Sequence, residues 1–309
     1  MYDLIGDIHG HATELKKLLT KMDYRPLDGV WQHPERKVIF LGDFVDRGPE
    51  QVEVVSIARA MVEQGHALAV MGNHEFNAVA WTMPDPEQPE AFLRPHTDKN
   101  RDQHGQFLAQ VGEGSELHQA FLDWFKTLPL YLDLPELRVV HACWHENHRQ
   151  IIGRYTDGQN RLLPDAWVAS ARKGSEAYEA VETLLKGVEI PLPEGVFFHD
   201  KDNHPRTNAR IKWWERETLT YRDLAMVPGK EIEKIPHSPV PGHVLVGYDG
   251  KKPVFVGHYW LKGMPAPLNE HVVCLDYSVA GGAGGKLCAY RFDGEARIKP
   301  EGFVWVERD

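Results

Sequence analysis

The sequence predicts an α/β fold built on a mostly parallel sheet. Three short apolar runs near the start are typical of strands, at about residues 2–6, 38–42 and 67–72. Two stretches between them, at about 12–23 and 51–64, carry apolar residues at helical spacing. Because strand and helix alternate, consecutive strands should run in the same direction with the helices covering the sheet.

The middle of the chain predicts an excursion from this core over residues 76–136. Four prolines and several acids in 82–105 indicate a loop, and a helix is expected at about 114–127. Strand character returns at 137–141. We interpret the whole chain, residues 1–309, as one domain that carries insertions.

A longer insertion is predicted at 142–241, since so long a charged segment is more than a connecting loop. Helices are expected inside it near 164–172 and 175–186. Short β-like runs then close the chain and suggest a second, largely antiparallel sheet. They lie at 244–248, 254–257, 271–276, 287–292 and 303–306.

Composition limits the classes of function. The 35 Lys and Arg against 45 Asp and Glu give a formal charge of −10, which repels duplex nucleic acid and anionic membranes at long range. An anionic substrate therefore needs a local positive feature. No apolar run approaches the roughly 20 residues of a membrane span. Three scattered cysteines and an acidic Asp3 in place of a basic leader predict a cytoplasmic protein without a secretory signal.

Three strand-to-loop junctions carry clusters of polar residues. They are Gly6-Asp-Ile-His-Gly10, Gly42-Asp-Phe-Val-Asp-Arg-Gly-Pro49 and Gly72-Asn-His-Glu75. Because the carboxyl ends of strands gather at one edge of an α/β sheet, Asp7, Asp43 and Asn73 should converge there. His9 follows Asp7 by two residues, so in extended backbone both side chains can point to the same side.

Two more histidines end predicted strands, His141 and His258. Two carboxylates, one amide oxygen and three imidazoles make a mixed oxygen and nitrogen set that suits manganese, iron or zinc, whereas calcium prefers oxygen alone. Six ligands are too many for one tetrahedral site that keeps a water, so we infer two metal ions bridged by one carboxylate. Asp43, in the central loop, is the expected bridge.

These ordered motifs resemble the calcineurin-like metallophosphoesterases, and within them the phosphoprotein-phosphatase branch. That branch includes symmetrical diadenosine-tetraphosphate hydrolases and the phosphatase part of bacterial polynucleotide kinase-phosphatases. Many distant relatives end with Gly-His-x-His, but this chain has Gly257-His-Tyr-Trp260, which favours the same branch. The resemblance implies two mixed β-sheets packed as a sandwich, flanked by helices and carrying inserted cap segments.

The resemblance also implies roles for single residues. His74 would be the general acid, held by Asp46, while Arg47 and Asn73 would bind phosphate, with Arg210 as a further clamp. The two cations would be manganese first, with iron, zinc or nickel as alternatives. Their implied ligands are Asp7, His9 and Asp43 for the first ion, and Asp43, Asn73, His141 and His258 for the second.

The expected function is hydrolysis of phosphomonoesters in a protein, nucleotide or small molecule, by direct attack of a metal-bridging hydroxide. One alternative is a symmetrical dinucleoside-tetraphosphate hydrolase that stacks a base on Trp213 or Trp214. Another is a nucleic-acid end phosphatase, against which the charge of −10 counts. The third is a catalytically inactive scaffold, which has no physical need for His74 or Asp46.

Three further features have plainer interpretations. The spacing of His141, His145 and His148 would allow a separate zinc site on a helix, but a strand-terminal His141 argues against it. Adjacent tryptophans on an insertion more often pack into a local core than stack a base. The glycine run 281–285 lacks the Lys-Ser/Thr ending of a phosphate loop and indicates a turn.

Overall fold

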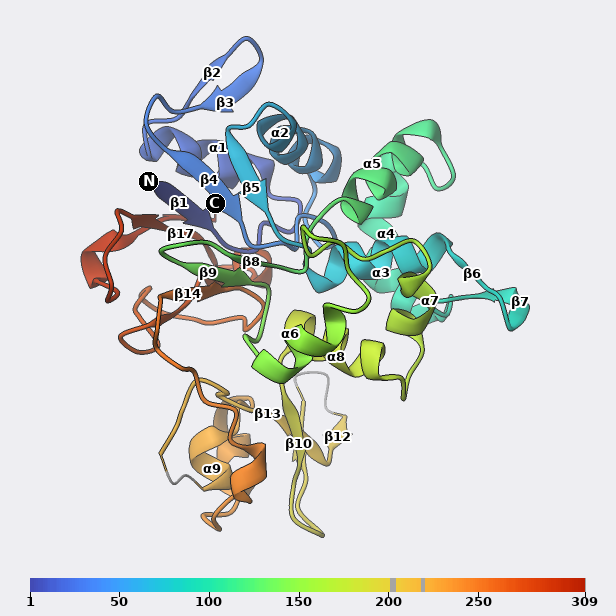
Figure 1. Cartoon of the computed structure of the whole chain (residues 1–309), viewed down its shortest axis with the longest axis vertical. Helices are drawn as coiled ribbons and strands as arrows, with labels where there is room; N and C mark the ends of the chain where they lie inside the picture. Colours follow the sequence, from blue (N-terminus) through green and yellow to red (C-terminus); the bar gives the residue numbers. More distant parts are fainter. Residues whose placement is uncertain (201–203, 218–219, 309) are drawn as a thin grey trace.

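The computed structural model describes residues 1–200, 204–217 and 220–308, and its centre is a pair of stacked β-sheets (Figure 1). The first sheet contains three parallel strands, β1 (Tyr2–Ile5), β4 (Lys37–Phe40) and β5 (Ala67–Ala69). Helices α1 (Ala12–Lys21) and α2 (Gln51–Glu63) lie within the two connections. The strand and helix alternation predicted for the first 72 residues is therefore confirmed.

The end of the chain completes this first sheet. β17 (Lys286–Phe292) pairs antiparallel with β1, and both β16 (Asp276–Tyr277) and β18 (Phe303–Glu307) pair antiparallel with β17. The strand order is β16-β17-β1-β4-β5, with β18 beside β17. The first and last parts of the sequence thus share one sheet, which makes it mixed rather than parallel.

The second sheet has the order β15-β14-β9-β8. β15 (Val272–Cys274), β14 (Val254–Val256) and β9 (Arg138–Val140) run parallel, and only β8 (Tyr131–Asp133) is antiparallel to its neighbour β9. The expectation of a largely antiparallel second sheet was therefore wrong. The connection 257–271 is long enough to return the chain to the starting edge, as parallel pairing requires, and β17 and β18 joined the first sheet instead.

An apolar layer between the two sheets holds them together. Alternate residues of the strands point into it, among them Leu4 and Ile39 from the first sheet and Val139, Phe255 and Val273 from the second. All five are fully buried. The opposite face of the first sheet packs against α1 and α2 through Ile5, Val38 and Phe40. Strands β1 and β4 are therefore covered on both faces.

The predicted loop at 82–105 was only partly correct. The segment contains a hairpin, β6 (Pro84–Asp85) with β7 (Gln88–Phe92), and then helix α4 (Asp98–Val111). The first turns of α4 are polar, and its buried apolar residues, Phe107, Leu108 and Val111, come only at its end, so this stretch has little helical periodicity. The helix expected at 114–127 is present as α5 (Glu116–Lys126).

The inserted segment has two parts. Its helices α6 (Glu146–Ile152), α7 (Ala166–Ala171) and α8 (Glu176–Lys186) pack their apolar faces into the main core. The following residues carry two small clusters of their own, one around Phe198 and one around Ile211. Figure 1 shows this later part at one end of the molecule. The strand expected at 244–248 is absent, since residues 242–244 form a 3-10 turn that leads into irregular chain.

The remaining described elements are short. They are β2 (Arg25–Leu27), β3 (Val30–Gln32), α3 (Asn73–Thr82), β10 (Glu189–Pro191), β11 (Phe198–His199), β12 (Pro205–Arg206), β13 (Asn208–Arg210), α9 (Tyr221–Leu224) and 3-10 turns at 229–234, 279–281 and 300–302. No helix among the described residues is both long and apolar enough to cross a membrane.

A buried ion pair fastens the start of the first sheet. Asp3 on β1 is fully buried and accepts hydrogen bonds from the Arg36 Nε at 2.9 and 3.0 Å. We expect Arg36→Met to lower the free energy of unfolding by about 3 kcal/mol, because it leaves a buried carboxylate without its main partner. Chemical denaturation measures this change. Arg59→Met, which breaks the exposed pair with Glu63, is the control and should cost less than about 1 kcal/mol; equal costs would contradict the argument.

Candidate active site

The polar side chains that follow five strands meet at one edge of the sandwich. β1, β4 and β5 of the first sheet lead into the loops of Asp7, Asp43 and Asn73, and β9 and β14 of the second lead into His141 and His258. All five side chains are buried to at least nine tenths. The structure therefore brings together residues that are up to 251 positions apart, as the strand-end argument predicts.

The carboxylate of Asp43 lies at the centre of this group. Its Oδ2 is 3.2 Å from the His141 Nε2, 3.7 Å from the His9 Nε2 and 3.9 Å from the His74 Nε2. Ligand atoms of Asp43 with His9 and His74, and of Asp43 with His141 and His258, form two groups that could each hold a metal ion. Asp43 belongs to both groups, which is the position that a bridging ligand requires.

The second group contains acceptor atoms that face each other. The His141 Nδ1 donates to the Leu41 carbonyl at 2.6 Å, so a neutral ring has only a lone pair at Nε2. That Nε2 faces the oxygens of Asp43 and, at 3.1 Å, Asn73, and the same Asn73 oxygen lies 2.8 Å from the His258 Nδ1. Such an arrangement is stable only with an extra proton or a cation between the acceptors.

The first group also contains a histidine whose ring is oriented by a backbone carbonyl. The His9 Nδ1 donates to the Val45 carbonyl at 2.8 Å, and its buried Nε2 has no hydrogen-bond partner among the described residues. Metal-binding histidines commonly use the second ring nitrogen in this way to fix the tautomer and orientation. Asp7 lies beside the ring, with its Oδ2 4.0 Å from the His9 Nε2. The residues present therefore fit divalent cations at both positions.

Charge in the buried cluster supports the same interpretation. Burial and repulsion from Asp276 raise the pKa of Asp7 well above its usual range. Burial and the neighbouring His74 lower the pKa of His9 to about 3, which keeps its imidazole neutral and available as a ligand. Burial opposes protonation of His141, but the attraction and hydrogen bond of Asp43, the charge of Asp7 and the Leu41 carbonyl together outweigh burial and raise the pKa of His141 to about 10. A cation would replace that proton.

The backbone at this edge is held in unusual conformations. His9, Asp43, Asp46, Arg47 and His258 all have φ between 46° and 73°, the left-handed region that non-glycine residues rarely adopt. Each such residue costs about 1–3 kcal/mol unless the surroundings enforce it. Left-handed residues therefore concentrate at the site, which aims their side chains at one point.

Glu75 enforces part of this geometry. Its carboxylate is fully buried and accepts backbone N–H groups of Asp43 at 2.8 Å, Phe44 at 2.8 Å and Gly72 at 3.0 Å. Glu75 was not among the residues expected in the site. The structure shows that it ties the loop after β4 to the start of α3, and its adjacency to the Gly-Asn-His motif was the available signal.

The residues expected to act on the substrate lie around the cluster. The His74 Nδ1 donates to the Asp46 carboxylate at 2.5 Å, which leaves the His74 Nε2 aimed at Asp43. The Arg47 guanidinium is exposed and stacks over the Trp260 ring, 4.5 Å from its centroid. Arg210 reaches the same cavity from β13, and after burial its positive charge is the main cause that lowers the pKa of His258.

A cavity of about 1210 Å³ opens above the cluster. Among the described residues that line it, Asp43 is the only carboxylate, against eight lysines and arginines. Lys186 pairs with Glu182, and Arg210 lies 3.7 Å from Glu189, but the other six have no carboxylate partner in the described part of the chain. This is the local positive feature that an acidic protein needs for an anionic substrate. The eight are Arg47, Arg94, Lys99, Lys186, Arg210, Lys212, Arg222 and Lys262.

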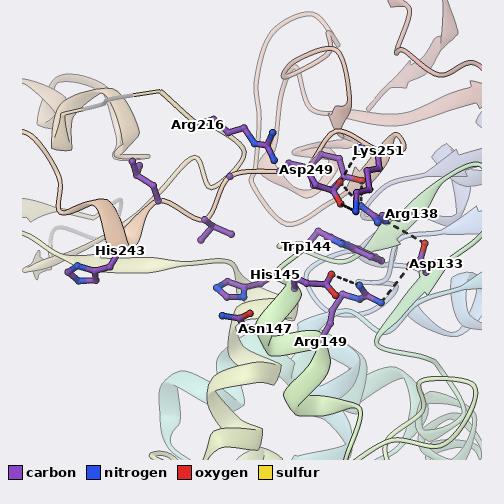
Figure 2. A pocket seen from close by; sticks show the side chains of 15 residues that line it. Asp133, Arg138, Trp144, His145, Asn147, Arg149, Arg216, His243, Asp249 and Lys251 are labelled. Carbon is purple, nitrogen blue, oxygen red and sulfur yellow. Dashed lines mark hydrogen bonds and ion pairs between the residues drawn. The ribbon is translucent and has the colours of Figure 1, made fainter.

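A second cavity, of about 680 Å³, lies between residues 144–149 and the returning chain at 243–251. Figure 2 shows Arg138 and Arg149 beside Trp144, both reaching Asp133, at 3.5 and 3.7 Å. Arg138 also donates to Asp249 at 2.7 Å. Because Arg138, Arg149 and Lys251 in this cavity pair with carboxylates that also line it, we interpret these pairs as the contacts that fix the returning chain at 243–251 against β9.

The other sequence features have structural explanations. Trp213 and Trp214 are almost fully buried, so neither offers a face to a base, and the packing interpretation is confirmed. His145 caps helix α6, and no group of ligands that includes His145 or His148 occurs among the described residues. The glycine run 281–285 begins in the 3-10 turn at 279–281 and connects it to β17, which agrees with the predicted turn.

A family model for the calcineurin-like phosphoesterases matches residues 2–256. The chain therefore belongs to the calcineurin-like phosphoesterase family, as the ordered motifs predicted, and is a hydrolase that acts on phosphoester bonds. Divalent metal ions are characteristic of such metallophosphoesterases, and the acceptor atoms around Asp43 fit them.

The more specific similarities are to proteins named bis(5′-nucleosyl)-tetraphosphatase PrpE [asymmetrical]. The protein from Oceanobacillus iheyensis is 30% identical over 141 residues, 45% of this chain and 54% of the relative. That from Bacillus subtilis strain 168 is 31% identical over 158 residues, 50% of this chain and 61% of the relative. The chain thus spans little more than half the length of these relatives.

Solved structures also resemble the chain over most of its length. A Saccharomyces cerevisiae protein serine/threonine phosphatase with similarity to human PP5 has a TM-score of 0.48 at 15% identity, covering 99% of this chain and 78% of that one. A cold-active protein-tyrosine phosphatase of a psychrophilic Shewanella species has a TM-score of 0.48 at 16% identity, covering 100% of this chain and 80% of that one.

Gly257 gives a test of the metal-binding geometry. A Cβ at this position would lie 2.0 Å from the Asp7 Oδ1, so Gly257→Ala must displace the Asp7 carboxylate. We expect manganese affinity, measured by isothermal titration calorimetry, to fall about 10- to 100-fold. Gly158→Ala, where the added Cβ meets open space, is the control. Unchanged manganese binding in the Gly257 variant would contradict the placement of Asp7 in the site.

Proposed function

We propose that the chain is a two-metal phosphoesterase that transfers a phosphoryl group directly to water. The observation that carries this proposal is the shared position of Asp43, whose Oδ2 faces the Nε2 atoms of His9, His74 and His141 from three other loops. Asp7, His9 and Asp43 would hold one ion. Asp43, Asn73, His141 and His258 would hold the other.

His74 occurs in one of the two candidate ligand groups, but its environment favours a different role. Its Nδ1 is occupied by Asp46, and the carboxylate stabilises the protonated ring. Burial opposes protonation, yet Asp43 and Asp46 together raise the pKa of His74. The Nε2 proton is thus available to a leaving oxygen beside Asp43. We therefore assign His74 as general acid and keep Asp7 as the ligand.

Side chains of the cavity then bind the substrate. Arg47 can present two N–H groups to phosphate oxygens, with Trp260 supporting its plane. Arg210 and Asn73 line the same cavity and can bind the remaining oxygens. When bound, two divalent ions of a metal such as manganese supply positive charge to the transferring oxygens and lower the pKa of a water.

Asp43 gives the decisive test of the two-metal arrangement. We expect Asp43→Asn to lower hydrolysis of p-nitrophenyl phosphate with added manganese at least about 100-fold, because one change weakens both metal positions. Calorimetry should also show fewer bound manganese ions per chain. The exposed Glu301→Gln is the matched loss of charge and should leave both measurements unchanged. Activity that survives the Asp43 change would refute the mechanism.

A dinucleoside tetraphosphate is a second candidate substrate, with support from two observations. The relatives that align with about half of this chain carry the name of asymmetrical bis(5′-nucleosyl)-tetraphosphatases. The cavity also extends beyond the metal positions and carries far more positive charge than one phosphate needs. The symmetrical alternative that the motifs left open differs from this only in which phosphorus is attacked.

Products and binding would decide this candidate. Asymmetrical cleavage of diadenosine tetraphosphate with manganese should give ATP and AMP, whereas symmetrical cleavage would give two ADP. We expect Lys99→Gln to raise KM for this substrate about threefold at low salt, as the loss of one exposed charge contact would, while KM for p-nitrophenyl phosphate stays constant. Lys173→Gln, outside the cavity, is the control. No cleavage of the tetraphosphate would dismiss the candidate.

A further inference from the structure

Asp46 binds a second histidine as well as His74. Its Oδ2 accepts the His74 Nδ1 proton at 2.5 Å, and its Oδ1 accepts the His104 Nδ1 proton at 2.7 Å. The Asp46 backbone N–H donates to the Gln51 side chain at 2.7 Å. Both carboxylate oxygens are therefore occupied by buried imidazoles, and the carboxyl group cannot rotate without breaking one of these bonds.

His104 is itself held in a closed aromatic pocket. It lies on α4 and is 3% exposed, with ring centroids 5.1 Å from Phe107 and 5.9 Å from Trp81. These two aromatic neighbours leave the ring little freedom to turn. The position of its Nδ1 is thus set by the side-chain packing of α4 and α3.

The other ring nitrogen indicates that His104 does more than fill space in the core. The His104 Nε2 is buried and has no hydrogen-bond partner among the described residues. An unsatisfied buried polar atom costs about 1–3 kcal/mol, which a phenylalanine or leucine here would avoid. Among the described residues, the bond to Asp46 is the polar contact that offsets this cost, so the side chain is suited to fixing that carboxylate.

We infer that His104 is a positioning residue for the general acid. By holding the Asp46 Oδ1, it directs Oδ2 to the His74 Nδ1 and so keeps the His74 Nε2 aimed at the position beside Asp43 where the leaving oxygen is protonated. The inference rests on the proposed role of His74 in phosphoester hydrolysis. It extends that role to a residue on α4, outside all the strand-end motifs.

Leaving-group dependence tests this inference. In the hydrolysis step a water oxygen forms a new bond to phosphorus, the P–O bond to the leaving group breaks, and the His74 Nε2 proton passes to the departing oxygen. Phenyl phosphate needs this proton because phenolate is a poor leaving group, whereas 2,4-dinitrophenyl phosphate hardly needs it. We expect His104→Leu to lower kcat about 10- to 100-fold for phenyl phosphate and less than about threefold for 2,4-dinitrophenyl phosphate, with KM constant. His104→Asn, which keeps an N–H near the Nδ1 position, should recover much of the loss.

His118→Leu is the matched control. His118 is as buried as His104 and packs against the same Phe107, with ring centroids 5.7 Å apart, but it does not contact Asp46. His118→Leu should change kcat for both substrates by the same factor, if it changes kcat at all. A proportional fall for both phosphates in His104→Leu, or no fall, would overturn the inference. If the leucine variant does not fold, the same comparison is made with His104→Asn and His104→Gln, of which only Asn places its amide near the Asp46 oxygen.

A spectroscopic readout separates this inference from the proposed function. In metal-free protein, proton NMR should show imidazole N–H signals from His74 and His104, the two rings that bond to Asp46, beside those of His9 and His141. His104→Leu should remove the His104 signal and shift that of His74, and His118→Leu should retain both. If His74→Ala also lowers kcat by the same factor for phenyl phosphate and 2,4-dinitrophenyl phosphate, the proposed role of His74 as general acid is wrong. If kcat falls more for phenyl phosphate than for 2,4-dinitrophenyl phosphate in His74→Ala but not in His104→Leu, only the proposed role of His104 is wrong.

Discussion

The Asp43 carboxylate is the point on which the site depends, because His9, His74 and His141 direct their Nε2 atoms at it from three other loops at a buried edge of the protein. Such a concentration of acceptors is unfavourable unless a positive charge enters, so folding and ion binding at this edge are coupled. The backbone is built to resist the resulting strain. Glu75 clamps the loop of Asp43 through three N–H groups, and the Leu41 and Val45 carbonyls fix the histidine rings.

The strand-end motifs could be predicted from sequence since each is local: an apolar run, a glycine and a polar residue in succession. Their convergence followed from the rule that parallel strands end together, which held for Asp7, Asp43 and Asn73. What sequence could not give was long-range pairing. β17 joined β1 from the far end of the chain, and the runs expected to form an antiparallel sheet divided between two sheets.

The same limit explains the residues that were missed. His104 lies in a polar stretch without strand or helix periodicity, and its contact with Asp46 spans 58 positions. The cations of the cavity come from six separate stretches of chain, so no local cluster of basic residues announces them. Trp213 and Trp214, by contrast, were suggestive as a pair and proved to be buried packing. Local chemistry predicted the residues that converge as candidate metal ligands, whereas tertiary structure alone defined the cavity.

The later part of the insertion has its own small apolar clusters, and it still contributes Arg210, Lys212 and Arg222 to the cavity wall. The ion-binding edge, in contrast, belongs to the sandwich. Mutations can therefore accumulate in the cavity wall without destabilising the ion-binding edge. A lineage could exchange the wall for another and acquire a new substrate, while the ancestral chemistry beneath it stayed intact.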